Sequence, residues 1–219
     1  MNETLNINEI FFSIQGEGTR AGLPCVFVRM QGCMLRCKWC DTDYALELRE
    51  IKNIISIEEI INKIKSFNCN FVELTGGEPL AQENTIILAR ILCELGYEVA
   101  IETNGYSDIS KLDSRVIKIM DLKCPASGMS KFNNFENIKY LTKNDEVKFV
   151  IADENDFNWA IEIIQKFDLI KKVNSILVSP AFGLCEPKKL AEKVLNSGLN
   201  IRLQLQLHKY IWEPNTRGV

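Results

Sequence analysis

The sequence is poor in three features that mark common classes of protein. It holds one histidine, His208, in 219 residues, and no apolar run approaches the roughly 20 residues that a membrane span needs. Its first residues lack a basic segment followed by an apolar stretch, the mark of a secretory signal. Surplus basic charge is missing too, because the net charge is −3, so nothing favours a nucleic-acid or anionic-membrane partner. We therefore expect a cytoplasmic protein whose thiols stay reduced.

Strand-like and helix-like segments alternate along the chain. No internal repeat or long linker interrupts them, which predicts a single domain over 1–219. Helical periodicity and capping residues predict helices over 56–67, 84–96, 154–167 and 186–198. Short apolar runs predict strands over 24–32, 70–79, 97–105, 116–123, 146–153, 174–181 and 199–208.

This alternation indicates parallel strands joined by helices, the α/β class. About six such units are too few for a closed eight-stranded barrel, so we expect a partial (β/α)6-type barrel, with an open doubly wound sheet as the alternative. Residues suited to chemistry follow several strands, as in "TGGEP" (75–79), "ETNG" (102–105) and "DLKCP" (121–125). Sites in such folds collect at the carboxyl ends of the strands.

A cluster of three cysteines, "CMLRCKWC", follows the first predicted strand. Cys33, Cys37 and Cys40 have the spacing C-x3-C-x2-C, and no fourth cysteine lies nearby. Structural zinc needs four ligands, and a redox pair needs only C-x-x-C. Three thiolates on one tight loop suit an iron–sulfur cube whose fourth iron stays open, although zinc and coincidence remain alternatives. The five other cysteines are scattered, and we expect them to pack as small hydrophobic residues.

"CMLRCKWC" and the later "TGGEP" resemble the two signatures of the radical S-adenosylmethionine (SAM) superfamily. "FFSIQGEGTRAGLPCVFVRMQGC", "CDT" and the terminal "HKYIWEPNTRGV" resemble, more closely, the 7-carboxy-7-deazaguanine synthase family of queuosine and deazapurine biosynthesis. The middle of the chain, roughly 106–172, matches only in pattern. The resemblance implies a shortened radical SAM barrel, a homodimer, and a [4Fe–4S] cluster, SAM and Mg²⁺ as cofactors. An external one-electron donor of the flavodoxin or ferredoxin type is implied as well.

The implied reaction converts 6-carboxy-5,6,7,8-tetrahydropterin to 7-carboxy-7-deazaguanine. Hydrogen abstraction at C6 by a 5′-deoxyadenosyl radical precedes ring contraction and loss of ammonia, and SAM is regenerated. The cofactor carries this chemistry, and the protein positions the substrate and excludes water. We assign no residue an acid–base role, because a radical step needs no strong base at C6.

The resemblance also implies roles for individual residues. The metal ligands are Cys33, Cys37 and Cys40 for the cluster, and Thr42 for Mg²⁺, with a turn-capping Thr42 as the alternative. The substrate-binding residues are Ile14, Gln15, Gly16, Arg29, Thr75, His208 and Val219. The cofactor-binding residues are Trp39, Asp41, Gly77, Glu78, Glu102, Asn104, Lys123 and Ser179.

For two of the substrate-binding residues, Arg29 and Val219, the chemistry of the group explains how it could bind the substrate. The forked guanidinium of Arg29 suits the substrate carboxylate. For the terminal tail we hypothesise that it folds over the pocket, where the Val219 carboxylate accepts hydrogen bonds from the pterin N–H groups.

Two other classes remain open at this stage. A glycyl-radical activase shares the short length and a similar cysteine motif, but it acts on a partner protein, and "SIQGEG" and the "RGV" terminus argue against it. A non-enzymatic iron–sulfur or zinc protein is the other alternative.

Overall fold

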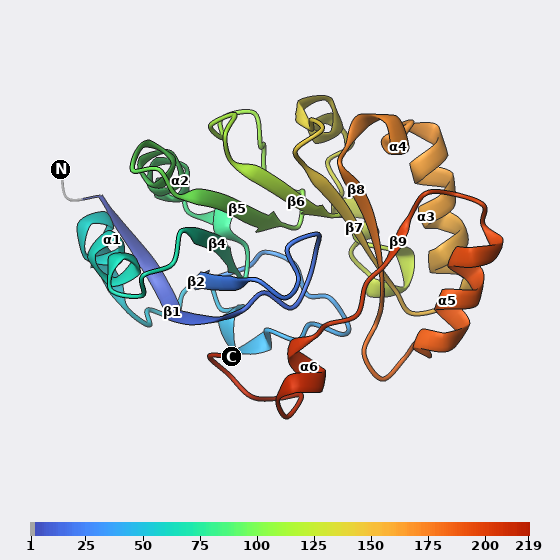
Figure 1. Ribbon diagram of the computed structural model, residues 1–219, viewed down its shortest axis with the longest axis horizontal. Helices are drawn as coiled ribbons and strands as arrows, with labels where there is room; N and C mark the ends of the chain where they lie inside the picture. Colours follow the sequence, from blue (N-terminus) through green and yellow to red (C-terminus); the bar gives the residue numbers. More distant parts are fainter. Residues whose placement is uncertain (1–2) are drawn as a thin grey trace.

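A single curved sheet forms the centre of the computed structural model, which describes residues 3–219 (Figure 1). The sheet has nine strands in the order β3-β1-β2-β4-β5-β6-β7-β8-β9. β1 runs antiparallel to both of its neighbours, and the strands from β2 to β9 are parallel. The strands are β1 (Thr4–Ile14), β2 (Pro24–Met30), β3 (Ile54–Ser56), β4 (Phe71–Gly76), β5 (Glu98–Thr103), β6 (Ile117–Asp121), β7 (Glu146–Ile151), β8 (Ser175–Pro180) and β9 (Arg202–Leu203).

The four long helices lie where the sequence predicted them. They are α1 (Ile57–Lys65), α2 (Asn84–Glu94), α3 (Glu154–Lys166) and α5 (Pro187–Asn196), accompanied by the short α4 (Leu169–Lys172) and α6 (His208–Ile211). Ser56 and Glu59 form the expected capping box, which satisfies N–H groups at the start of α1. Past the end of α2, Gly96 adopts a φ of 88°, a left-handed conformation that favours glycine. Short 3₁₀ segments complete the chain: η1 (Asp43–Ala45), η2 (Pro79–Ala81), η3 (Pro125–Ser127), η4 (Ser130–Phe132) and η5 (Phe135–Tyr140).

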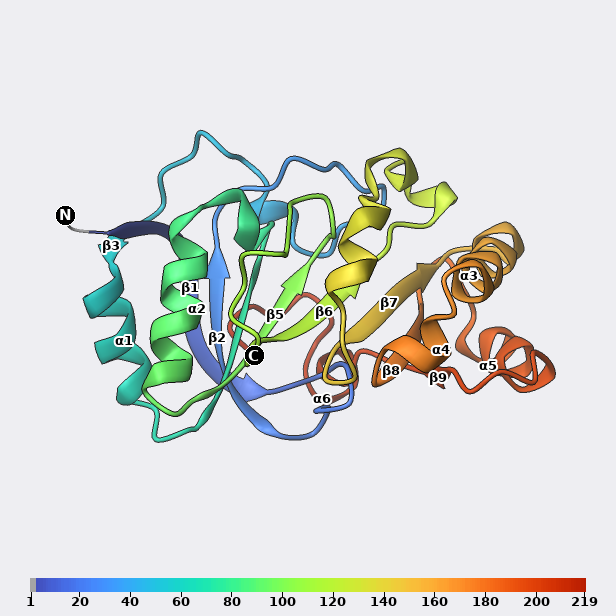
Figure 2. The same cartoon turned by 90° about the horizontal axis from the view of Figure 1, so that it is seen from above.

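Two apolar layers lie on opposite faces of the sheet. Alternate strand residues such as Val28, Leu74 and Phe149 pack against the helices in the larger core. The opposite residues, including Phe27 and Leu177, form a smaller cluster on the concave face. The helices cover the outer face only, as Figure 2 shows, so the sheet is a partial barrel and not a doubly wound sheet.

The structure differs from the predicted pattern in three places. The strand β1 was not predicted, although Leu5 and Ile7 alternate with polar residues and are buried. The short strand β3 was not predicted either. The strand expected over 199–208 is hydrogen-bonded in the sheet at Arg202–Leu203 only.

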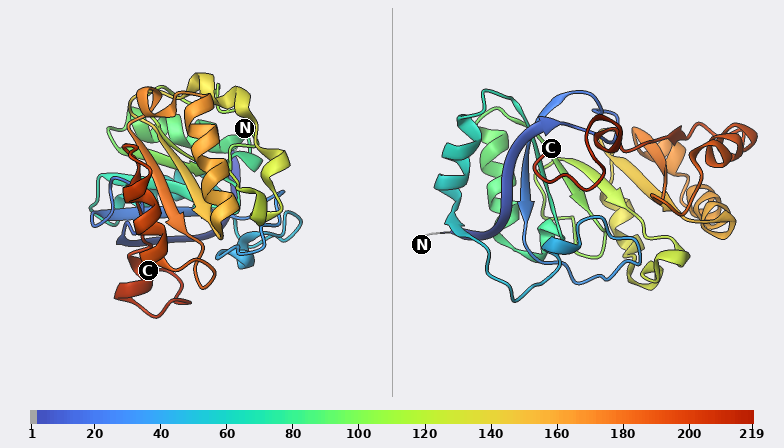
Figure 3. Two further views of the ribbon diagram at one scale, coloured as in Figure 1. Left: turned by 90° about the vertical axis from the view of Figure 1, so that its right-hand side faces the viewer. Right: turned by 90° about the horizontal axis from the view of Figure 1, so that it is seen from below.

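The residues that follow β9 cross the open side of the partial barrel and bind the loop after β1. Leu207 N donates to Gly16 O at 3.0 Å, and Gly18 N donates to Gln204 Oε1 at 2.6 Å. Gln204 and Gln206 both donate to the Glu17 carboxylate, at 2.8 and 2.9 Å. The loop after β1 and the segment after β9 therefore meet at the mouth of the barrel (Figure 3). Within residues 3–219, no helix has the length and apolar character that crossing a bilayer requires.

Candidate active site

A cavity of about 630 Å³ lies over the carboxyl ends of the strands and is roofed by the C-terminal tail. Its lining combines residues from β2, β4, β5, β6, β7 and β8 with the cysteine loop and residues 214–219. Most of the predicted site residues line it: Ile14, Gln15, Gly16, Arg29, Cys37, Trp39, Cys40, Asp41, Thr42, Thr75, Gly77, Glu102, Asn104, Lys123, Ser179, His208 and Val219. Cys33 and Glu78 are the two predicted residues that lie behind this surface.

The cysteine loop is fixed on both sides. Gly32 N and Cys33 N donate to the carbonyls of Ala45 and Leu46, at 2.8 and 3.0 Å, while Lys38 N donates to Ser127 O at 3.2 Å. The Cys33 thiol is buried and accepts contacts from Leu35 N at 3.4 Å and Asn104 Nδ2 at 3.7 Å. N–H groups directed at a cysteine sulfur are typical of iron–sulfur sites, where they tune the cluster.

The chemistry of this loop fits a cluster better than a single ion. All three cysteines are free, and burial raises the pKa of each thiol, to about 11 for Cys37. A cationic metal group would reverse that preference and hold the sulfurs as thiolates. Within residues 3–219, no three His, Cys, Asp or Glu side chains converge closely enough for one metal ion. Three thiols without a fourth protein ligand therefore favour the open iron–sulfur cube over closed zinc.

The glycine pair after β4 lets the backbone pass directly beneath the cysteine loop. A Cβ atom on Gly77 would meet Ala45 O at 2.6 Å, and one on Gly76 would meet Met30 N and O at 2.5 Å. Gly76 also has a φ of 143°. These glycines are required for close approach.

Glu78 has a different position from the predicted one, since its side chain does not line the cavity. The residue is fully buried, and its carboxylate accepts from Thr103 Oγ1 at 2.8 Å, Asn104 N at 2.7 Å and Leu80 N at 3.0 Å. It joins the end of β4 to the end of β5. In the structure Glu78 therefore positions Asn104, and we withdraw its assignment as a direct SAM contact.

A polar wall for a nucleoside-like ligand faces the cysteines. Asp121 is 6% exposed, and its Oδ2 accepts from Lys123 Nζ at 2.7 Å, while its buried Oδ1 has no partner among the described residues. Ser179 is also buried at the cavity surface. An unpaired buried oxygen is costly unless a ligand supplies a donor, and ribose hydroxyls or an ammonium group would do so. These residues therefore fit SAM beside the cluster.

Arg29 lies between two aromatic rings at the surface of the cavity. Its guanidinium lies 5.7 Å from the centre of Phe11 and 5.8 Å from that of Tyr44. Its Nε donates to Glu9 Oε1 at 2.8 Å, and Glu9 also accepts from the Tyr44 hydroxyl at 3.1 Å. The terminal nitrogens of Arg29 meet no acceptor within residues 3–219, so they can donate to a ligand carboxylate.

Thr42 and Asp41 follow the last cysteine. The Thr42 hydroxyl donates to Asp41 Oδ1 at 3.1 Å and makes no capping bond to the following 3₁₀ turn. Burial would raise the pKa of Asp41, but a hydrogen bond from Gln206 and the charge of Lys209 lower it to about 2. Two hard oxygen donors thus lie together at the cavity surface, where Mg²⁺ could bind.

His208 contacts the loop that contains Gly16. A Cβ atom on Gly16 would meet His208 Nδ1 at 2.5 Å, so only glycine leaves room for this ring. Burial lowers the pKa of His208. A neutral imidazole therefore faces the cavity, which suits a positioning contact with a flat heterocycle.

The C-terminal tail lies at the surface of the cavity. The guanidinium of Arg217 lies 3.8 Å from the centre of the Tyr44 ring, and residues 214–219 line the cavity. Residues 213–218 are exposed, whereas Val219 turns inward and is half-buried. In Figure 1 the chain end accordingly lies beside the segment that follows the cysteine loop. The tail thus covers the side of the cavity near Tyr44.

Three buried charged residues of the cavity, Glu73, Asp121 and Lys148, were not predicted, and neither was the partly buried Glu17. Lys148 Nζ bonds Glu102 Oε1 at 2.7 Å and also pairs with Glu17, and Gln15 Nε2 donates to Glu73. Glu73 and Lys148 interrupt the apolar strands "FVELTG" and "EVKFVI", in which their neighbours on both sides are buried. A charged residue inside a fully buried strand is the signal that could have revealed them.

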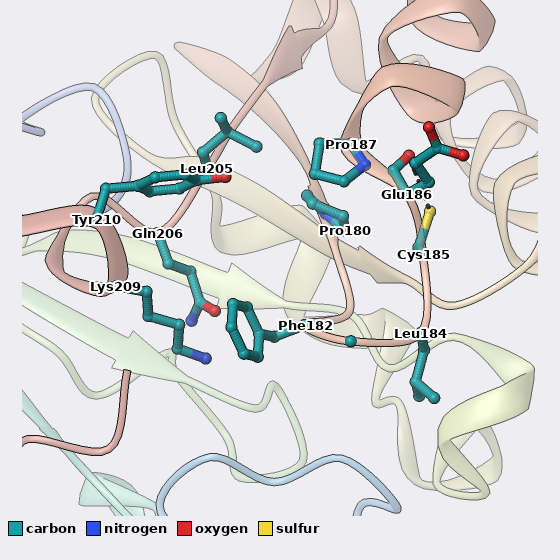
Figure 4. A pocket seen from close by; sticks show the side chains of 11 residues that line it. Pro180, Phe182, Leu184, Cys185, Glu186, Pro187, Leu205, Gln206, Lys209 and Tyr210 are labelled. Atoms are coloured by element: carbon teal, nitrogen blue, oxygen red, sulfur yellow. Dashed lines mark hydrogen bonds between the residues drawn. The ribbon is translucent and has the colours of Figure 1, made fainter. Parts of the chain in front are cut away.

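A second, apolar cavity of about 500 Å³ lies behind Phe182. Figure 4 shows Leu184, Leu205 and Tyr210 around it. The Lys209 ammonium lies 4.4 Å from the centre of the Phe182 ring, and both residues line the two cavities. The Phe182–Lys209 pair therefore separates this groove from the main cavity.

Comparison with known proteins agrees with this geometry. The model of the Radical SAM superfamily matches residues 27–194. A 7-carboxy-7-deazaguanine synthase from Chlorobaculum tepidum is 44% identical over 98% of this chain and 97% of its own length. That of Koribacter versatilis is 40% identical, over 98% of this chain and all of its own. The crystal structure of QueE from Escherichia coli shares the fold, with a TM-score of 0.75 at 24% identity over 93% of this chain and 94% of that one. The chain belongs to the 7-carboxy-7-deazaguanine synthase family of the radical SAM superfamily.

Proposed function

We propose that this protein converts 6-carboxy-5,6,7,8-tetrahydropterin to 7-carboxy-7-deazaguanine with loss of ammonia. The observation that carries the proposal is the shared cavity, which Cys37, Cys40 and Arg29 all line. A substrate whose carboxylate pairs with Arg29 would extend toward the cysteine loop. Family membership and the chemistry of the lining residues therefore support the same activity.

The cofactors have defined places in this arrangement. Cys33, Cys37 and Cys40 would hold a [4Fe–4S] cluster, and Gly77, Asn104, Asp121, Lys123 and Ser179 would surround SAM, beside Trp39. When bound, the cluster and SAM supply a radical that abstracts hydrogen. We also propose Mg²⁺ near Thr42, because a hard cation at that place would bind oxygen donors of the protein and the substrate.

The residues of the chain bind, orient and shield. Arg29 offers a planar fork to the substrate carboxylate, and its position between Phe11 and Tyr44 fixes that fork. Gly16 allows the ring to approach the backbone, and Thr75 and His208 border it. The tail covers the cavity and excludes water, which keeps the reacting centre dry.

The tail also weighs against a glycyl-radical activase. Such an enzyme must admit a segment of another protein, whereas here residues 214–219 occupy part of the mouth. A small ring system fits a cavity of about 630 Å³.

The remaining assignments are the setting and the partners. We propose that the protein works in the cytoplasm as one domain, because residues from both ends of the chain build the cavity. We propose a homodimer and an external flavodoxin- or ferredoxin-like electron donor. The exposed side chains of Phe182, Leu184 and Tyr210 beside the apolar groove support a protein contact there. Light scattering of the purified protein tests the dimer.

An anaerobic assay tests the activity. Protein reconstituted with iron and sulfide receives carboxytetrahydropterin, SAM, Mg²⁺ and a reductant, and mass spectrometry detects the deazapurine. Cys37→Ala should lose both iron and product, whereas Cys69→Ala, a half-buried thiol away from the cavity, should keep both. The absence of deazapurine from a fully loaded wild-type protein would refute the proposed function.

A further inference from the structure

Four acidic and basic side chains form a connected group on the concave side of the cavity. Glu73 on β4, Glu102 on β5 and Lys148 on β7 face the concave side, and Glu17 reaches them from the loop after β1. We call Glu17, Glu73 and Glu102 the acidic tier. Glu73 lies two residues before Thr75, which pairs with Arg29, and is therefore about 7 Å deeper than Arg29. Glu102 follows Ile101, the partner of Leu74, and is therefore level with Thr75.

Apolar residues flank the acidic tier on the concave face of the sheet. Phe27 and Ala100 pair with Glu73, Ile119 pairs with Glu102, and Leu177 pairs with Lys148. The carboxylates therefore obtain hydrogen-bond partners only from other polar side chains or from the cavity. Each ionised carboxylate has about four acceptor positions, so the tier has more acceptors than its protein donors fill.

Lys148 holds two members of the acidic tier together. Its ammonium bonds Glu102 and pairs with Glu17, and its side chain is 7% exposed. The side chains of Glu17 and Glu102 are 18% and 27% exposed. The Lys148 ammonium is therefore more buried than the carboxylates of Glu17 and Glu102, whose unpaired oxygen positions face the cavity.

Lys148 also stays charged in this position. Burial alone would lower its pKa, but Glu102 and Glu17 raise it well above the usual value. Gln204 and Gln206 donate to Glu17 from the opposite side, which fixes that carboxylate in the loop. The anions are thus oriented before any ligand arrives.

The cavity is polar in a defined direction. Arg29 is on β2, and Glu102 is at the same register level on β5, with β4 between them. The two strands are about 10 Å apart, so the cation and the carboxylate lie on different sides of the cavity. A carboxylated pterin has the complementary polarity, because its carboxylate is at one end of the ring system and its 2-amino and ring N–H donors are at the other. Unpaired carboxylates in a closed site discriminate strongly against a ligand that lacks the matching donor.

We propose that the acidic tier is the specificity element for the 2-amino edge of the substrate and that Lys148 is its positioning residue. This inference rests on the proposed function, since it assigns an orientation to that substrate. Glu17 and Glu102 accept from the amino group and the adjacent ring N–H. Lys148 touches neither the reacting atoms nor the ligand, and acts by aiming these two carboxylates.

The test compares the binding of two stable, fluorescent ligands. 6-Carboxypterin keeps the 2-amino group, and 6-carboxylumazine has a carbonyl oxygen in its place. Wild-type protein loaded with cluster and SAM should bind the pterin at least about tenfold more tightly, the effect of one charge-assisted hydrogen bond. Lys148→Met should abolish this preference, and Lys148→Arg should restore most of it. Glu102→Gln keeps the shape of the side chain and should also reduce the preference for the pterin. If the Lys148→Met protein does not fold, the Glu102→Gln protein alone provides the test.

Two results overturn the inference. One is equal affinity of the wild-type protein for the two ligands. The other is an unchanged preference in the well-folded Lys148→Met or Glu102→Gln protein. Failure of the proposed function is seen separately, because it appears as a loaded wild-type enzyme that makes no deazapurine, whatever the binding preference.

Discussion

The imidazole of His208 lies directly against the backbone of Gly16, so that a Cβ atom there would meet Nδ1 at 2.5 Å and the His208 backbone N at 3.2 Å. This contact joins the first loop of the chain to the segment after β9. It is reinforced by the hydrogen bond from Leu207 N to Gly16 O at 3.0 Å. Because His208 lines the cavity, the spacing of these two segments sets the width of the pterin site.

Replacing Gly16 by alanine should therefore weaken substrate binding more than it weakens the fold. The added methyl group must displace both the imidazole and the backbone of His208. We expect about a tenfold loss of 6-carboxypterin affinity, or about 1.4 kcal/mol, with the cluster spectrum and SAM binding retained. Fluorescence titration of the pterin measures this effect.

Gly22→Ala is the matched control in the same loop. Unlike Gly16, Gly22 has a positive φ, of 94°, but no atom lies within 4 Å of the position of its Cβ. It therefore reports backbone strain without the clash. Equal pterin affinities for the Gly16→Ala and Gly22→Ala proteins would show that the His208 contact does not shape the site.

Glu73→Gln should stabilise the protein at neutral pH. Burial, with Glu102 and Glu17 nearby, raises the pKa of Glu73 well above its ordinary 4.5. A carboxyl group whose folded pKa lies above its unfolded one opposes folding once the pH rises past the unfolded value. Below about pH 4.5 the group is neutral in both states, so the effect vanishes there. A glutamine at position 73 keeps an oxygen that accepts the hydrogen bond from Gln15, and it has no titratable carboxyl group.

Urea unfolding from about pH 4 to about pH 8 measures the difference. The gain in unfolding free energy should grow with pH, at about 1.4 kcal/mol for each pKa unit separating the two states. Glu192→Gln on the exposed face of α5 serves as control and should leave the pH profile unchanged. A gain in the Glu73→Gln protein that is the same at every pH would contradict the electrostatic cause.

Local signals in the sequence were sufficient for much of the site. The spacing of Cys33, Cys37 and Cys40 and the pair Gly76–Gly77 are short motifs whose geometry is fixed within a few residues, and the structure brings them together. The helices were predictable for the same reason, since caps and periodicity are local.

Features that depend on distant pairing could not be read in this way. Glu78 looked like a ligand because it stands in the signature, but Thr103 and Asn104, about 25 residues further on, bury its carboxylate. The Leu–Gln alternation after β9 did indicate extended chain. Gln204 N still donates to Val178 O on β8, but further bonds go to the loop containing Gly16 and Gly18, and no local feature of the sequence predicts that partner.

Thr42→Ala should raise the Mg²⁺ concentration needed for half-maximal turnover. The structure directs the Thr42 hydroxyl to Asp41 and not to a helix cap, so its loss removes an oxygen donor without melting a turn. We expect a shift of about tenfold, the loss of one ligand worth about 1.4 kcal/mol. Thr42→Ser keeps the hydroxyl and should behave as wild type. An identical Mg²⁺ titration for the Thr42→Ala and wild-type proteins would remove Thr42 from the metal site.

Deleting residues 217–219 should impair substrate binding while the fold persists. Arg217 lies 3.8 Å from the centre of the Tyr44 ring, a cation–π contact worth about 0.5–2 kcal/mol. Tyr44 in turn borders Arg29 and donates to Glu9, so the tail supports the place expected for the substrate carboxylate. The half-buried Val219 brings its carboxylate to the same cavity.

Two variants separate these contributions. Arg217→Met keeps the tail length and the terminal carboxylate but removes the cation, so it should lose only a few-fold in pterin affinity. The deletion removes both groups, and we expect a loss of ten- to a hundredfold, the range of about 1.5–3 kcal/mol for a charge-assisted hydrogen bond. Pterin affinity, SAM affinity and melting temperature are measured on the same preparations. If the melting temperature falls while pterin affinity stays within about twofold, below 0.5 kcal/mol, the tail only packs and the Val219 carboxylate has no role in binding.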